Sequence, residues 1–140
     1  MTDQTDALGE LFLRLARRIR RQTLTRIRPL GLNPHLSRAL RVIGETEPLR
    51  PSALAERLDI APRSASDSIA TLLASGWIER APDPQDGRAY RISLTPAGRQ
   101  LSAQVRSIRR QVAREFFAEL SAADRDRLAS ILHQLDTESP

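Results

Sequence analysis

The segment from residue 76 to residue 98 reads GWIERAPDPQDGRAYRISLTPAG, and its pattern predicts a β-hairpin. Residues 77–80 form a short first strand. Tyr90, Ile92 and Leu94 recur at every second position, which is typical of a half-buried strand. The run PDPQDG at 82–87 consists of turn-forming residues and joins the two strands.

Two predicted helices precede this hairpin. Pro51 begins a short helix, residues 59–61 form a three-residue turn, and Pro62 begins a second helix that Gly76 ends. The apolar residues of the second helix, Ala65, Ile69, Leu72 and Leu73, are predicted to face inward. Two helices joined by a short turn and followed by a hairpin have the order of a winged helix-turn-helix.

Helical periodicity also predicts a long N-terminal helix over about 6–28, which Pro29 and Gly31 end. Asn33 is the predicted N-cap of a further helix that begins at Pro34. These helices precede the winged helix-turn-helix pattern.

Two further helices follow the hairpin. Thr95 is the predicted cap of a long helix that runs to about residue 116. Ser121 opens a last helix with a sequence that resembles a capping box, and residues 136–140 are expected to form a loose tail.

The predicted fold is therefore mainly α-helical with a small β-hairpin, in one continuous fold. Residues 34–95 form a winged helix-turn-helix unit for DNA binding. The helices of residues 1–33 and 96–140 carry apolar stripes too long for that unit to cover, so we expect them to form a two-fold homodimer. A monomeric helical bundle is the alternative.

The composition indicates a folded protein with an anionic partner. Of 140 residues, 28% are charged, and all 22 basic residues are arginine, with a net charge of +5 and a pI near 11.2. Such a charge favours nucleic acid as partner. With no cysteine and two histidines, we expect no disulfide, metal or cofactor. The sequence shows no leader peptide and no 18-residue apolar run, so a cytoplasmic protein without a membrane segment is expected.

Much of the excess charge lies near the start of the chain, where residues 1–33 hold seven arginines and three acidic residues. A solvated helix face accounts for this pattern, and so does a surface that contacts DNA or an acidic ligand. An amphipathic helix on an anionic membrane is a third interpretation.

The second helix of the helix-turn-helix pattern presents candidate DNA-binding residues on its outer side. Short hydroxyl side chains allow close approach to the major groove, and Arg63 can donate two hydrogen bonds to guanine. Asp67 would face a cytosine amino group or an arginine. The candidates are Arg63, Ser64, Ser66, Asp67, Ser68 and Thr71; ordinary solvent exposure of the serines is the alternative.

The hairpin supplies a second set of candidates. Arg88 at its tip is predicted to enter the minor groove, and Asp86 to hydrogen-bond it. Arg80 and Arg91 at the base would contact phosphates or balance the charge of Glu79. The alternative is an ordinary charged turn.

Four segments together resemble the MarR family of bacterial transcriptional regulators: LAERLDIA at 54–61, GWIER at 76–80, DPQDGRA at 83–89 and LTPAG at 94–98. The resemblance implies a homodimer on a roughly palindromic operator, acting as a repressor that a small, often aromatic anion releases. By position, Ser64, Ser66 and Asp67 match recognition-helix residues of the family, Arg88 matches its wing-tip arginine, and Asp86 matches the acid that steadies it. Trp77 departs from the smaller aliphatic residue usual there, and we expect it to pack at the start of the strand.

The resemblance also implies an effector site between the dimer helices and the winged unit. Candidates are Arg14, Arg17, Arg18 and His35, although a surface or capping role also accounts for His35. Without cysteine, the peroxide-sensing branch of the family does not fit. No enzyme motif occurs in the sequence, and a winged-helix adaptor that binds protein instead of DNA is the remaining rival.

Overall fold

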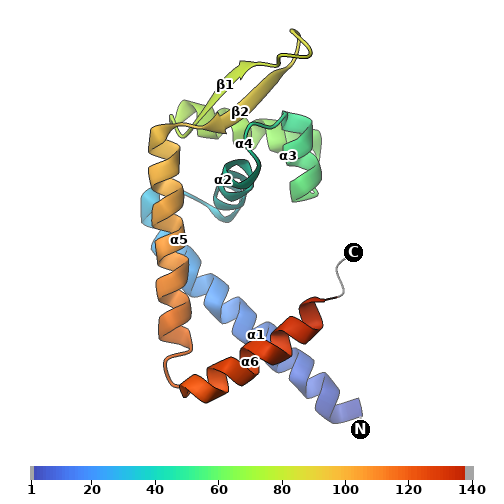
Figure 1. Cartoon of the computed structure of the whole chain (residues 1–140), viewed down its shortest axis with the longest axis vertical. Helices are drawn as coiled ribbons and strands as arrows, with labels where there is room; N and C mark the ends of the chain where they lie inside the picture. The colour runs from blue at the N-terminus through green and yellow to red at the C-terminus, as the bar shows by residue number, and fades with distance from the viewer. Residues whose placement is uncertain (1, 138–140) are drawn as a thin grey trace.

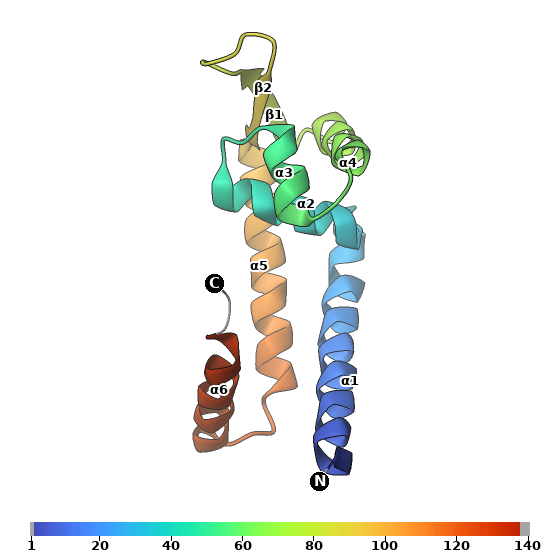
Figure 2. The same cartoon turned by 90° about the vertical axis from the view of Figure 1, so that its right-hand side faces the viewer.

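Two long helices, α1 (Thr2–Ile27) and α5 (Pro96–Phe116), run along the molecule, and the elements that separate them in the sequence gather at one end (Figures 1 and 2). The computed structural model describes residues 2–137. In chain order, α1 is followed by a 3-10 turn (Arg28–Leu30), α2 (Pro34–Thr46), α3 (Pro51–Leu58), α4 (Pro62–Ala74), β1 (Ile78–Pro82) and β2 (Tyr90–Leu94). Helix α6 (Ala122–Asp136) comes after α5. This order confirms the predicted mainly α-helical fold with one hairpin.

The core lies where α2, α3, α4 and β2 meet. Its large side chains with almost no exposed surface include Leu40, Ile43, Leu54, Ile69, Leu72 and Ile92. Each comes from the apolar stripe of its own element, so the helical and strand periodicities converge on one cluster.

Side-chain caps fix where three helices begin. Asn33 Oδ1 accepts a hydrogen bond from the backbone N–H of Leu36 at 2.8 Å, and Thr95 Oγ1 accepts one from Gly98 at 3.0 Å. Ser121 Oγ accepts one from Asp124 at 3.1 Å. All three predicted N-caps are confirmed, because each satisfies a backbone donor that the first helical turn leaves free.

The hairpin is joined to the segment between α2 and α3. Its strands pair antiparallel, from Ile78 opposite Leu94 to Pro82 opposite Tyr90. Leu49 adds a bridge on the other side of β2, with backbone hydrogen bonds of 3.2 and 2.9 Å to Ile92. The hairpin is thus held in place against the helix-turn-helix.

Trp77 packs beside the core where β1 begins, as expected from the sequence. Its backbone also lies so close to α5 that position 98 of that helix needs a glycine. A Cβ atom at Gly98 would lie 1.9 Å from the Trp77 carbonyl oxygen. That same oxygen accepts a hydrogen bond from the Thr95 N–H at 3.1 Å. Glycine at 98 therefore allows the first turn of α5 to approach the hairpin backbone.

The ends of the chain differ slightly from the prediction. Helix α1 begins at Thr2 instead of near residue 6, with Asp3 in its first turn, where a negative charge favours a helix. Helix α6 includes Asp136, which was predicted to lie in the loose tail. Residues 138–140, also predicted as tail, lie outside the described part of the chain.

The outer helices keep apolar surface exposed in the single chain. On α1 and α6 the exposed large apolar residues are Leu8, Leu11, Phe12, Leu13, Ile131, Leu132 and Leu135. No residue of α6 is buried. Within residues 2–137, no helix combines the length and apolar character needed to cross a membrane.

Candidate nucleic-acid interface

Helix α4 turns one face to the core and leaves its polar face exposed. Ala65, Ile69 and Leu72 are buried, while the predicted contact residues Arg63, Ser64, Ser66, Asp67 and Thr71 are exposed and Ser68 is half-buried. The Thr71 hydroxyl donates a hydrogen bond to the Asp67 carbonyl oxygen at 3.1 Å. This bond orients the hydroxyl along the helix.

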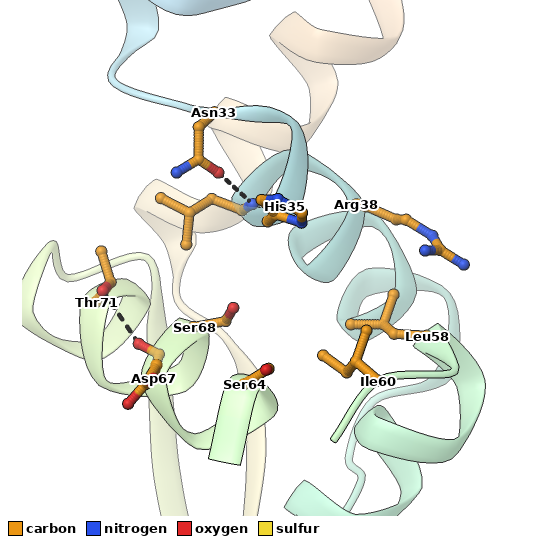
Figure 3. A pocket seen from close by; sticks show the side chains of 10 residues that line it. Asn33, His35, Arg38, Leu58, Ile60, Ser64, Asp67, Ser68 and Thr71 are labelled. Carbon is orange, nitrogen blue, oxygen red and sulfur yellow. Dashed lines mark hydrogen bonds between the residues drawn. The ribbon is translucent and has the colours of Figure 1, made fainter. Parts of the chain in front are cut away.

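The predicted contact residues lie on two sides of α4. Ser64, Asp67, Ser68 and Thr71 line a hollow of about 390 Å³ between α4 and the start of α2, which we call the α2–α4 hollow. Figure 3 shows His35 on the α2 side of this hollow, facing the α4 residues. Ser66 instead lines a separate hollow beside α3. Arg63 is exposed and lines neither of the two.

The hairpin places its arginine at the far end of the molecule. Asp86 Oδ1 accepts a hydrogen bond from the backbone N–H of Arg88 at 3.1 Å, so the acid shapes the turn through the main chain. The Arg88 side chain is exposed. Figure 2 shows the turn projecting beyond the helices, which leaves it free to approach a partner.

Arg80 and Arg91, predicted at the base of the hairpin, lie in the middle and the loop half of its strands and have partners that the sequence did not predict. The guanidinium of Arg80 lies 5.5 Å from the centre of the Tyr90 ring, a cation–π geometry. Arg91 pairs with Asp83 at 3.2 Å, whereas Glu79 was one predicted partner.

Asp83 is a site residue that the sequence did not single out. Its carboxylate is fully buried and pairs with Arg50 Nε at 2.6 Å as well as with Arg91. The hydrogen bond from Arg50, followed by that from the Gln85 N–H, holds the pKa of Asp83 well below its usual range. Hydrogen bonding to Asp83 also raises the pKa of Arg50. Arg50 lies 33 residues away, so no local pattern connects the two.

The four predicted effector residues are not brought together. Arg18 lies with its guanidinium 5.4 Å from the centre of the Phe116 ring and lines a groove of about 630 Å³ between α1 and the turn after α5. His35 lines the α2–α4 hollow. Arg14 and Arg17 are exposed on α1.

A different set of arginines gathers between α1, α2 and α5. Arg20, Arg38, Arg41 and Arg109 line a hollow of about 470 Å³, which we call the arginine pocket. Arg38 also borders the α2–α4 hollow, and in Figure 3 its guanidinium points away from α4. Burial, and secondly the charge of Arg41, lower the pKa of Arg109, against an opposing effect of Glu45. These arginines come from three helices, so spacing along the chain does not predict the pocket.

The arginine pocket also contains an unsatisfied polar group. Ser37 lines it and is only 4% exposed, and its Oγ has no hydrogen-bond partner within the described residues. Buried hydroxyls are normally hydrogen-bonded. The Ser37 Oγ itself is buried, so the groups here that suit a small anion are the cations that face the hollow.

Known proteins agree with this architecture. The model of the MarR family matches residues 30–89. The HTH-type transcriptional regulator MT0903.1 of Mycobacterium tuberculosis is 34% identical over 105 residues, which cover 73% of each chain. The HTH-type transcriptional repressor Rv2887 of the same species is 24% identical over 131 residues, 94% of each chain.

The fold is also similar to that of a MepR mutant from Staphylococcus aureus bound to an oligodeoxyribonucleotide. The TM-score is 0.73 at 19% identity, covering 93% of this chain and 96% of the other. MarR proteins are transcription regulators, not enzymes. The winged helix-turn-helix, the flanking helices and these similarities show that the chain belongs to the MarR family of DNA-binding transcriptional regulators.

Proposed function

We propose that this protein is a homodimeric repressor that binds a pseudo-palindromic operator and is released from it by a small anion. One observation carries the proposal: the exposed polar face of α4 and the arginine-tipped hairpin lie at the same end of the molecule (Figure 1). The name of Rv2887, a repressor, supports the direction of regulation. Such a regulator acts in the cytoplasm, where bacterial operators lie.

Two elements, helix α4 and the hairpin, contact DNA in this proposal. Helix α4 enters the major groove, where Arg63 and the residues around the α2–α4 hollow meet base edges and phosphates. The hairpin reaches the next minor groove, whose negative potential attracts Arg88. The MepR mutant similar in fold was solved with an oligodeoxyribonucleotide, which supports this docking.

The dimer follows from the uncovered apolar surface of the outer helices. Leu8 is 64% exposed, Phe12 54% and Leu135 71% in the single chain, and large exposed apolar residues gathered on two helices mark an interface. A second copy that packs its own α1 and α6 there covers both faces. Two-fold symmetry then sets two recognition helices about 34 Å apart along the duplex, one turn of B-DNA.

Selection of bound duplexes from a random DNA library tests these two proposals together. We expect enriched sequences with two inverted half-sites whose centres are about 10 base pairs apart. If the protein binds no duplex even at low salt, the reading as a protein-binding adaptor replaces that of a repressor. A single unrepeated half-site would overturn the dimer.

The effector proposal rests on the arginine pocket, which lies between the outer helices and the winged unit (residues 34–95). This pocket replaces the scattered set Arg14, Arg17, Arg18 and His35 as the site we propose, since it brings four arginines from three helices to one hollow. Benzoate serves as a probe of the class, with the neutral benzamide as its matched control. We expect benzoate to weaken operator binding and benzamide to leave it unchanged; equal effects of the two would contradict an anion site.

A further inference from the structure

Where the hairpin strands meet their loop, two arginines surround one buried acid. Asp83, with 0% of its side chain exposed, accepts hydrogen bonds from Arg50 Nε at 2.6 Å, Arg91 Nε at 3.2 Å and the Gln85 N–H at 2.8 Å. We call Arg50, Asp83 and Arg91 the Asp83 cluster. Three donors on one carboxylate fix the positions of both arginine side chains.

Both arginines use only Nε to hold the acid. Their terminal nitrogens, Nη1 and Nη2, make no hydrogen bond to protein within residues 2–137. The side chains are 43% and 31% exposed, so these donors are accessible from solvent. Paired donors on a fixed guanidinium match the oxygen atoms of a phosphate.

The charge of the cluster is also suited to an anion. One carboxylate faces two guanidinium groups, so one positive charge remains uncompensated among these three groups; the charge of Asp86 in the loop also acts on Arg50, more weakly than Asp83. Asp83 is buried beneath the arginines, so an approaching anion meets the guanidinium groups and not the acid.

The cluster joins the hairpin to the start of α3. Arg50 is the N-cap residue of α3, the first helix of the helix-turn-helix, which in this motif crosses the DNA backbone. Arg91 lies in β2, one residue from the hairpin loop. The Leu49–Ile92 bridge holds the two segments together. With α4 in a major groove and the hairpin in the adjacent minor groove, the phosphate strand between those grooves passes this point.

We propose that the Asp83 cluster is a phosphate clamp, in which Nη groups of Arg50 and Arg91 bind one backbone phosphate of duplex DNA. This proposal rests on the DNA docking proposed above. The contact carries no base information, and it sets the position of the hairpin relative to α4 on the duplex. Asp83 acts as a positioning residue because it orients both donors without touching DNA.

The salt dependence of binding to a random-sequence duplex tests the clamp, since each phosphate contact contributes about 0.9 to the slope of log K against log salt concentration. We expect Arg50→Gln and Arg91→Gln each to weaken binding with a lower slope, and the double variant to lower the slope by about 0.9 per bound subunit, because the two arginines share one phosphate. Arg106→Gln, the same charge change at an exposed position of α5, is the matched control and should keep the slope.

Asp83→Asn separates orientation from charge. It removes a negative charge near DNA, so charge alone predicts tighter binding, whereas the clamp predicts weaker binding with a lower slope because the arginines lose their anchor. A circular dichroism melt confirms that each variant is folded. If both arginine variants match Arg106→Gln while Arg88→Ala weakens binding, the clamp is wrong and the proposed function stands. If the unsubstituted protein binds no duplex at low salt, the proposed function fails as well.

Discussion

Replacing Gly98 with alanine is expected to destabilise the fold by about 2 kcal/mol, from three contributions. The new Cβ would lie 1.9 Å from the Trp77 carbonyl oxygen and 2.9 Å from its carbonyl carbon, and both are backbone atoms that cannot turn aside. Overpacking of this kind costs about 1–3 kcal/mol. If α5 moves away from Trp77, the hydrogen bond from the Thr95 N–H to that oxygen also weakens, which costs about 0.5–1.5 kcal/mol. Replacing a glycine inside a helix with alanine stabilises the helix by about 0.5–1 kcal/mol, which offsets part of this cost.

Urea unfolding followed by circular dichroism measures this change. The protein concentration must be held constant, because the stability of a dimer depends on it. Gly9→Ala is the matched control: nothing lies within 4 Å of a Cβ there, so the same substitution should stabilise α1 by about 0.5–1 kcal/mol. If Gly98→Ala unfolds at the same urea concentration as the unsubstituted protein, the close approach of α5 to the hairpin is refuted.

Four further results are expected. Hydrogen bonds lower the pKa of Asp83, so its carboxylate stabilises the fold above the ordinary aspartate pKa range, and this stabilisation is lost as pH falls through and below that range. Asp83→Asn should therefore flatten the acid side of a stability profile measured by urea unfolding between about pH 2 and 5. Phe12→Glu should shift sedimentation from dimer to monomer, whereas Glu10→Arg, on the opposite face of α1, should not; a dimer in both variants would place the interface elsewhere. Arg88→Ala should lower affinity mainly for operators with A·T-rich flanks in a gel shift, and an equal loss on every sequence would make it a phosphate contact. Arg109→Gln should reduce the effect of benzoate on operator binding, and an unaltered benzoate response would remove Arg109 from the effector site.

Local signals predicted the elements of this fold well. The caps Asn33, Thr95 and Ser121 each act within their own first helical turn, so a short sequence window contains the whole interaction. The hairpin was equally visible, because its turn residues and its alternation lie within one segment. Its strand bounds moved by only one or two residues.

Contacts between distant elements were not predictable in this way. Asp83 looks like an ordinary turn residue until the fold brings Arg50 to it across 33 positions. The arginine pocket likewise draws Arg20 from α1 and Arg109 from α5. On arginine-rich helices, spacing alone does not distinguish a side chain that joins a pocket from one that remains in solvent.

The junction between the hairpin and α5 has a mechanical consequence. Only Thr95 separates the end of β2 from the start of α5, and its backbone is bonded to Trp77, so no flexible hinge intervenes. Helix α5 has 21 residues and is therefore about 31 Å long. A tilt of about 5° at its far end sweeps the attached wing through roughly 3 Å at this lever length. In the proposed dimer, a modest rearrangement where the two subunits meet would thus move both wings out of register with the grooves of the double helix.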